Sequence, residues 1–324
     1  MGDACLDRIG LVAIGRNEGE RLRACLASVV HRVAHVVYVD SGSTDGSVAL
    51  AQAMGVHVVN LDMTVPFTAA RARNEGWRAL LQLAPGLEFV QFVDGDCVVA
   101  DGWLDKALLF LLQNPGYAVA CGRRRERFPE RSVYNRLCDL EWNTPVGDAK
   151  ACGGDALVRV SALQQVGGYR DDLIAGEEPE LCVRLRQAGW RIHRLDAEMT
   201  LHDAAMTRFG QWWKRSKRAG YAFAQGAWLH GAAPERHWVK ETVSALVWGA
   251  VLPVLMLLLA CFVHPAWLLL GCTYPLQIWR LRRLPGGLQR AVFLVLGKFP
   301  EAMGVLQFAW DRLWRSHGRL IEYK

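Results

Sequence analysis

The sequence lacks the cysteine spacing that marks a disulfide framework or a structural zinc site. Its nine cysteines are scattered, and no two of them are separated as in C-x-x-C. Several of them, including Cys25, Cys182 and Cys261, fall within apolar patterns. Cysteines used in this way are typical of small, reduced core residues. We therefore expect neither disulfides nor a cysteine-bound zinc ion.

The sequence also shows no internal repeat and no low-complexity segment, and we expect no signal peptide. Residues 1–8 have no apolar core of the signal-peptide type, so we expect the globular part of the protein to stay in the cytoplasm. The formal net charge is +6, with basic clusters at 123–127, 214–218 and 280–283. The last two flank apolar segments, where basic side chains contact anionic headgroups. These clusters predict a membrane as partner, and no nucleic acid.

Apolar runs long enough to cross a membrane are absent before Trp238. Residues 242–263 then contain no charged side chain, and about 20 apolar residues in a helix span a bilayer core of about 30 Å. The uncharged run 266–279 is shorter and fits either a tilted helix or a re-entrant hairpin. Residues 291–310 include one lysine and one glutamate, which favours an amphipathic surface helix, with a third span as the alternative.

Before Trp238, short apolar strands alternate with helical patterns. This alternation predicts an α/β fold with a Rossmann-like, mostly parallel sheet. The length and the change of composition predict two domains, 1–235 for nucleotide binding and 236–324 for membrane helices and an amphipathic helix. The expected strands are 9–14, 36–39, 56–59, 89–93, 117–121 and an edge strand at 190–195, with an unpatterned basic loop at 123–131.

Carboxylates follow two of these strands directly. Asp40 ends the strand 36–39, and Asp94 and Asp96 follow the strand 89–93. Because an open α/β sheet binds ligands at the carboxyl ends of its strands, these positions predict a nucleotide and metal site. Hard oxygen ligands suit Mn²⁺ or Mg²⁺ as the cofactor.

Four motifs occur in order at or beyond such strand ends: Val12-Ala13-Ile14-Gly15-Arg16-Asn17-Glu18, Asp40 to Ser47, Asp94-Gly95-Asp96, and Gly176 to Leu185. Over about residues 8–230 the chain resembles the bacterial membrane-associated family 2 glycosyltransferases, which have the A-type nucleotide-diphospho-sugar transferase fold. The resemblance implies an inverting, metal-dependent enzyme. It would transfer a sugar from a nucleotide-diphosphate donor to a lipid-linked or polysaccharide acceptor at the cytoplasmic face of the bacterial inner membrane.

The resemblance also implies roles for residues around the donor and the metal. Asp96 would ligate the cation, Asp94 would contact the ribose or reach the metal through water, and Gly95 would let the backbone approach closely. Asp40 would hold the base or the ribose, although Ser41 stands where the family commonly has a second acid. His202 would complete the metal shell. The other donor-binding candidates are Arg16, Asn17 and Glu18 at the pocket edge and, near the diphosphate, Arg71 or Arg73 with Asn74, of which Arg71 is preferred.

Inverting transfer is a single displacement, so the acceptor hydroxyl needs a base on the face opposite the leaving diphosphate. By resemblance Glu178 holds the position of this base. Glu177 is the possible substitute, because the acidic pair is Glu-Glu where Glu-Asp is commoner. The loop with Gly154 and Asp155 resembles the acceptor-side loop of the family, and Trp142 would be a platform for stacking a sugar.

Two other functions are compatible with a related fold. A nucleotidyltransferase that makes the activated sugar would need a Gly-rich loop with Arg and Lys after the first strand, and residues 15–18 lack it. A membrane scaffold that binds nucleotide-sugars without turnover would not need Asp94, Asp96 and Glu178, which are all present.

Overall fold

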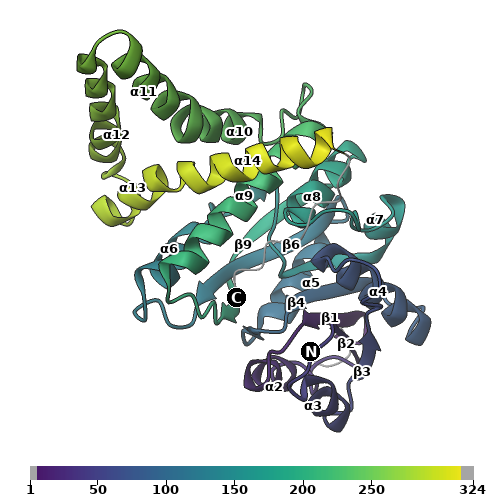
Figure 1. The fold of residues 1–324 in the computed structure, drawn as a ribbon. Coiled ribbons are helices and arrows are strands. Elements are labelled where there is room, and N and C mark those ends of the chain that lie inside the picture. The colour runs from purple at the N-terminus through teal and green to yellow at the C-terminus, as the bar shows by residue number, and fades with distance from the viewer. Residues whose placement is uncertain (1–5, 315–324) are drawn as a thin grey trace. The chain divides into compact units, whose positions relative to one another are not determined.

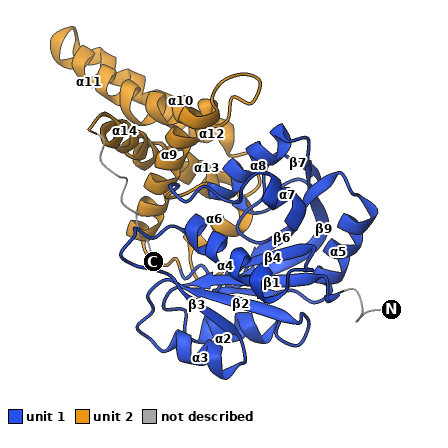
Figure 2. Ribbon diagram, turned by 90° about the vertical axis from the view of Figure 1, so that its right-hand side faces the viewer, with its two compact units in different colours: residues 1–129, 141–173, 177–205 blue, residues 130–140, 174–176, 206–324 orange. Residues whose placement is uncertain are grey.

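The computed structural model describes residues 6–314, which form two compact units (Figure 2). Unit 1 contains the chain up to Pro129 together with 141–173 and 177–205. Unit 2 contains 130–140, 174–176 and the chain from Met206 onward. Among the described residues, the strands all belong to unit 1, and unit 2 is helical (Figures 1 and 2).

Unit 1 is built on one nine-stranded sheet in the order β3-β2-β1-β4-β8-β6-β9-β5, with β7 paired to β9. The strands are β1 (Ile9–Gly15), β2 (His35–Asp40), β3 (His57–Asn60), β4 (Phe89–Asp94), β5 (Cys97–Val99), β6 (Tyr117–Glu126), β7 (Gly147–Ala149), β8 (Ala156–Arg159) and β9 (Arg191–His202). The strands β1 to β4 run parallel to one another, and β8 enters antiparallel between β4 and β6. The predicted α/β fold with a mostly parallel sheet is confirmed.

The central strands are buried on both faces because helices cover the sheet, and β1, β2 and β4 are accordingly almost continuously apolar. The helices of unit 1 are α2 (Glu20–Ala27), α3 (Ser47–Ala53), α4 (Ala69–Leu83), α5 (Trp103–Gln113), α7 (Val160–Gln165) and α8 (Glu177–Gln187). The helix α4 packs closely on β1, since a Cβ at Gly76 would lie 2.3 Å from a methyl group of Val12. Glycine is therefore required at this crossing.

The strand register places the acidic motifs at one edge of the sheet. Gly15 pairs with Asp40 across β1 and β2, and Ile14 pairs with Asp94 across β1 and β4. The backbone N–H of Gly95 then donates to the carbonyl of Ile14 at 2.8 Å. The carboxyl ends of these parallel strands thus meet where ligands bind in such sheets.

The strand β9 differs from the sequence prediction. It continues to His202, well past the expected edge strand 190–195, and it lies between β6 and β5. Its partner β6 extends to Glu126, through half of the segment predicted to be a basic loop. The arginines of this segment fit a strand because acidic side chains of other strands pair with them, as Glu198 pairs with Arg125 at 2.9 Å.

Unit 2 has a closely packed pair of helices at its centre. Its elements are α6 (Val133–Glu141), α9 (Phe209–His230), α10 (Val239–Leu246), the π-helix η1 (Val247–Val251), α11 (Leu252–Phe262), the 3₁₀-helix η2 (Pro265–Cys272), α12 (Thr273–Leu281), α13 (Gly287–Leu296) and α14 (Lys298–Leu313). The helix α14 packs along α9 at two glycines. A Cβ at Gly220 would lie 2.0 Å from the carbonyl oxygen of Glu301, and one at Gly304 would lie 2.0 Å from that of Lys217.

Two helices of the described chain are long and apolar enough to cross a membrane, Val239–Phe262 and Gly287–Leu313. The first is a continuous rod of α10, η1 and α11. Only 6% of its most apolar 18-residue stretch is buried, compared with 39% for the same stretch of the second helix, whose α14 part contacts α9. Most of the rod is therefore exposed, but it also packs on α14, where a Cβ at Gly249 would lie 1.9 Å from the carbonyl oxygen of Lys298.

Candidate active site

Asp94 ends β4 between two arginines. Its Oδ1 lies 2.9 Å from Arg73 Nη2, and its Oδ2 lies 2.8 Å from Arg124 Nη2. Burial alone would raise the pKa of Asp94, but the guanidiniums of Arg124 and Arg73 outweigh it and hold this pKa well below its usual range. Asp94 is therefore a fixed negative charge at the ligand-binding edge of the sheet.

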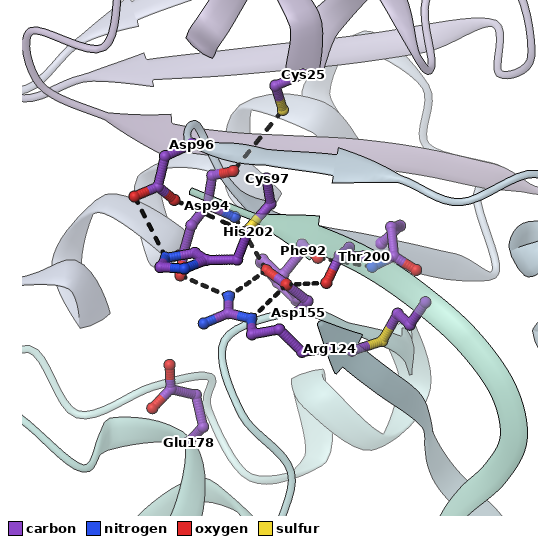
Figure 3. Close-up of polar contacts among 12 residues, drawn as sticks. Cys25, Phe92, Asp94, Asp96, Cys97, Arg124, Asp155, Glu178, Thr200 and His202 are labelled. Carbon is purple, nitrogen blue, oxygen red and sulfur yellow. Dashed lines mark hydrogen bonds and ion pairs between the residues drawn. The ribbon is translucent and has the colours of Figure 1, made fainter. Parts of the chain in front are cut away.

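Arg124 on β6 connects Asp94 to a second buried carboxylate, Asp155, which precedes β8 (Figure 3). Asp155 is fully buried; its Oδ2 accepts from Arg124 Nε at 2.7 Å and from Thr200 Oγ1 at 2.5 Å. Its Oδ1 accepts the backbone N–H of Asp94 at 3.1 Å. Its expected contact with the acceptor stays a prediction; in the structure the Asp155 carboxylate faces these protein groups. It positions Asp94 and Arg124.

Asp96, in the turn between β4 and β5, faces His202 at the end of β9 (Figure 3). His202 Nε2 lies 3.3 Å from Asp96 Oδ2, and both residues are buried. The indole of Trp142 stands edge-on to the imidazole at a centroid distance of 4.8 Å and also covers Arg124. Trp142 is partly exposed. Its contact with His202 places the predicted stacking platform next to the predicted metal ligands.

Cys97 belongs to two groups of side chains whose ligand atoms lie close enough together to hold a metal ion. One group also contains Asp96 and His202, and the other contains Asp94 and Asp155. Within each, the ligand atoms lie within 4.8 Å of one another. Burial raises the pKa of the Cys97 thiol well above its usual range, so the thiol stays protonated. The residues that fit a hard divalent cation are thus the oxygen and nitrogen donors Asp96, Asp94 and His202.

Glu177 and Glu178 begin α8, and both contact Arg73. Arg73 Nη1 donates to Glu177 Oε1 at 2.7 Å, and Arg73 Nη2 lies 3.1 Å from Glu178 Oε1. Burial and the adjacent Glu177 carboxylate raise the pKa of Glu178 to about 7, against the opposing effect of Arg73. The Glu178 side chain keeps 14% of its surface exposed, compared with 5% for Glu177. Glu178 is the better placed of the two to exchange a proton near neutral pH.

Arg71, preferred from the sequence as a donor ligand, points away from these carboxylates. Its guanidinium donates to the carbonyl oxygens of Asp62 and Val65, and so it fixes the loop before α4. Arg73 takes the position predicted for Arg71, because residues two apart on a helix project in nearly opposite directions. Arg73, which the sequence had offered as the alternative, is thus the arginine that faces these carboxylates, and donor binding by it stays a prediction.

The other donor-binding candidates lie at the ends of β1 and β2. Asn17 accepts from the backbone N–H of Thr44 through its Oδ1 at 2.7 Å, which ties the two strand ends together. Asp40 is 3% exposed, and its carboxylate accepts from Tyr38 Oη and from backbone N–H groups of the following loop. Asp40 therefore shapes this loop in the structure, while Arg16 and Asn17 are exposed beside it.

Sequence reasoning missed Arg124 and Glu126 entirely. Both stand in the segment taken for an unpatterned basic loop, and both are carried by β6 to the candidate site. The signal that could have found them is the alternation of side chains along a strand: Arg124 and Glu126 are two residues apart and share one face.

The close packing of Gly154 against Arg73, Glu178 and Asp94 can be tested by substitution. A Cβ at this position would lie 2.4 Å from Arg73 Nη2, 3.0 Å from Glu178 Oε1 and 3.2 Å from Asp94 Oδ2. We expect Gly154→Ala to displace Arg73 and to lower the transfer rate by at least about tenfold, which corresponds to about 1.4 kcal/mol. Gly153→Ala is the matched control, because its Cβ would enter open space. Equal rates for the two variants would contradict the expected crowding.

Comparison with known proteins assigns the class. Residues 12–162 match the model of glycosyl transferase family 2. The succinoglycan biosynthesis protein ExoA of Rhizobium meliloti is 24% identical over 79% of this chain and 82% of its own length. The pre-mycofactocin glycosyltransferase of Mycobacterium tuberculosis is 28% identical over 66% of this chain, which spans about half (46%) of that protein.

Solved structures agree on the fold. The mannosyltransferase PcManGT from Pyrobaculum calidifontis, solved in complex with GDP-Man and Mn²⁺, superposes with a TM-score of 0.66 at 20% identity. The match covers 94% of this chain and 88% of that one. Staphylococcus aureus TarS (residues 1–349) superposes with a TM-score of 0.51 at 13% identity, over 94% and 91% of the two chains. These likenesses confirm the A-type glycosyltransferase fold.

The chain therefore contains a family 2 glycosyltransferase domain, and the resemblance read from its motifs is confirmed. The protein is a glycosyltransferase of the kind that uses a nucleotide-sugar donor. This finding favours that function over the nucleotidyltransferase and the silent scaffold that the sequence left open.

Proposed function

We propose that the protein is an inverting, divalent-cation-dependent glycosyltransferase that moves a sugar from a nucleotide diphosphate to a lipid-linked or polysaccharide acceptor at the cytoplasmic face of the inner membrane. The observation that carries the proposal is the arrangement around Arg73, which contacts Asp94 on one side and Glu178 on the other. One side of this cluster carries fixed negative charge and the other carries a carboxyl that titrates near neutrality. Metal-assisted departure of the diphosphate needs the fixed negative charge, and base-assisted attack by the acceptor hydroxyl needs the titrating carboxyl.

The site would hold a cation through Asp96, Asp94 and His202. When bound, Mn²⁺ or Mg²⁺ supplies charge neutralisation on the leaving diphosphate. An imidazole ligand suits Mn²⁺ better than Mg²⁺. The protein's part is to keep the ligands ionised and oriented: Arg73 and Arg124 hold Asp94, and the Asp155 carboxylate fixes its backbone.

Glu178 would accept the proton of the acceptor hydroxyl while the oxygen of that hydroxyl attacks the anomeric carbon. General-base catalysis is most effective when the pKa of the base lies near the working pH, and the pKa of Glu178 is raised to about 7. Glu177 is held by Arg73 at 2.7 Å, and we assign it to orientation of that arginine. Gly154 brings the acceptor-side loop against Glu178, and Trp142 would stack on a sugar ring.

The nucleotide would lie at the ends of β1, β2 and β4, where Arg16, Asn17 and Glu18 form the rim. Gly95 allows close approach of the backbone, since a Cβ there would lie 3.1 Å from the carbonyl oxygen of Ile14. Asp40 would contribute to nucleotide binding indirectly, because its carboxylate accepts the backbone N–H groups of the loop after β2 and so fixes this loop.

Residues 1–235 are proposed as the catalytic domain and 236–324 as the membrane part. Within unit 2, Val239–Phe262 exposes large apolar side chains along its length, among them Val251, Leu257 and Leu258. The helix α14 packs on this rod at Gly249 and also along α9, whose surface carries Lys214, Arg215 and Lys217. This packing supports a surface position for α14 over the alternative of a third span.

A donor screen tests the enzymatic proposal. Thermal-shift measurements with UDP-, GDP-, CMP- and dTDP-sugars, each with and without Mn²⁺, should show stabilisation by one donor family that depends on the cation. NMR of the product formed from that donor should then show the opposite anomeric configuration. Retention of configuration would exclude single displacement, and stabilisation that is unaffected by the cation would exclude the metal site.

Membrane insertion gives a separate prediction. We expect alkaline carbonate to leave the wild-type protein in the membrane and to release Leu257→Arg/Leu258→Arg, because each charge in the bilayer costs at least about 2.5 kcal/mol. Leu109→Arg is the matched control, since Leu109 is equally exposed but lies on α5 of unit 1. If wild type is itself released, the segment does not span.

Cysteine labelling tests the topology separately. With Cys261 and Cys272 replaced by serine, single cysteines at positions 264 and 283 should be labelled from opposite sides of the membrane.

A further inference from the structure

His202 is held between two carboxylates, only one of which belongs to the proposed metal ligands. Its Nε2 lies 3.3 Å from Asp96 Oδ2, and its Nδ1 lies 3.6 Å from Glu126 Oε2. The imidazole is 6% exposed, and Trp142 packs edge-on against it. The ring therefore faces Asp96 with Nε2 and Glu126 with Nδ1.

Glu126 is fixed by the sheet itself. It is 3% exposed and pairs with His202 in the parallel register of β6 and β9. Its Oε1 accepts the backbone N–H of Phe128 and its Oε2 accepts that of Ala204, both at 3.1 Å. Two backbone donors from different segments thus hold the carboxylate in one orientation, with Oε2 toward the imidazole.

The two nitrogens of a neutral imidazole have different roles. A metal binds the nitrogen that carries a free electron pair, and the proton then sits on the other nitrogen, which usually donates it to a carboxylate or a carbonyl. Nδ1 of His202 makes no hydrogen bond within the described part of the chain. Its distance to Glu126 Oε2 exceeds a hydrogen-bond length by about 0.4 Å, which a small tilt of the ring removes.

We propose that Glu126 is a positioning residue that accepts the Nδ1 proton of His202 and so directs the Nε2 electron pair toward Asp96 and the cation. The inference rests on the proposed cation site and adds a residue to it that does not touch the cation. Glu126 also sets the orientation of the ring, because its own position is determined by backbone groups.

Glu126→Gln is the variant that tests this role. Its side-chain amide can present an N–H to Nδ1, which favours the proton on Nε2 and blocks the ligand position. We expect the affinity for Mn²⁺, measured by titration calorimetry and by EPR with UDP and with GDP present, to fall by about 10 to 100-fold. Glu198→Gln, on the exposed surface of β9, the strand that carries His202, should bind Mn²⁺ as wild type does.

Asp96→Ala and His202→Ala separate this inference from the proposed function. If both bind Mn²⁺ as tightly as wild type, the cation site itself is wrong. If both lose affinity and Glu126→Gln does not, the cation site stands and the role of Glu126 is wrong.

A measurement on the unchanged protein covers the case in which Glu126→Gln fails to fold. With ¹⁵N-labelled histidine and Mg²⁺ with UDP or GDP, NMR should show a proton on Nδ1 of His202 that exchanges slowly with water and resonates downfield, as expected for donation to a carboxylate. A His202 signal with the proton on Nε2, or with rapid exchange at Nδ1, would overturn the proposal.

Discussion

Asp96→Ala is expected to abolish sugar transfer while leaving the fold intact. Loss of this ligand removes charge neutralisation on the leaving diphosphate, an effect of several kcal/mol, and we expect a decrease in kcat/KM of at least about 10³-fold. Initial rates and Mn²⁺ binding should be measured on the same preparation. The side chain is almost fully buried beside His202, so the melting temperature must be recorded with them.

Asp101→Ala is the matched control for this variant. Asp101 follows β5 in the same part of the sequence, and its side chain is fully exposed. It should keep both activity and Mn²⁺ binding. Full turnover by Asp96→Ala in the presence of EDTA would exclude the metal mechanism.

Glu178→Gln is expected to bind the donor nearly as wild type does but to transfer the sugar at least about 10²-fold more slowly, the usual scale for loss of a general base. Single-turnover rates with donor bound in advance separate the chemical step from binding. A larger defect in Glu177→Gln than in Glu178→Gln would reverse the assignment of the pair.

The pH profile of the wild-type enzyme provides a check on the same residue. Glu178 must be ionised to accept a proton, and its pKa is raised to about 7. The groups that act on it are Glu177 on its own helix, Arg73 on α4 and Asp94 on β4. We therefore expect the rate to fall tenfold per unit as the pH drops below about 7, and this acid limb should vanish in Glu178→Gln. An acid limb that stays unchanged in the variant would assign it to another group.

The acidic residues of the site could be predicted because their signal is local. Asp40, Asp94 and Asp96 directly follow apolar strands, and parallel strands bring their carboxyl ends to one edge whatever the rest of the chain does. The order of the motifs then suggested the family.

The basic residues of the site could not be chosen in this way. Arg71 and Arg73 lie on one helix, and the sequence does not show which of them faces the sheet edge. The decision depends on where α4 begins, which is set by Thr68, whose hydroxyl accepts the backbone N–H of Arg71 at 3.0 Å. A shift of the helix start by one residue would turn each side chain by about 100°.

Long-range pairing explains the remaining differences. Arg124 is neutralised by Asp94 and Asp155, which are 30 and 31 residues away in the sequence. Without these partners a basic run is typical of a solvated loop, and so the extension of β6 and the position of Glu126 were not visible. The burial of Asp155, which the sequence placed in an acceptor-side loop, was not visible for the same reason, since its three partners come from β4, β6 and β9.

The packing of α14 against α9 has a consequence for the order of biosynthesis. The helix α9 leaves the ribosome first, the apolar rod Val239–Phe262 follows, and α14 comes last among the described helices. At the moment when the rod is synthesised, the partner that completes the α9 surface does not yet exist. The rod that we propose as a membrane span is therefore complete before α14 is made, and the Gly220 and Gly304 contact closes afterwards. A chain that stops before Gly287 would keep the rod Val239–Phe262 but leave α9 without the contacts that α14 makes with it.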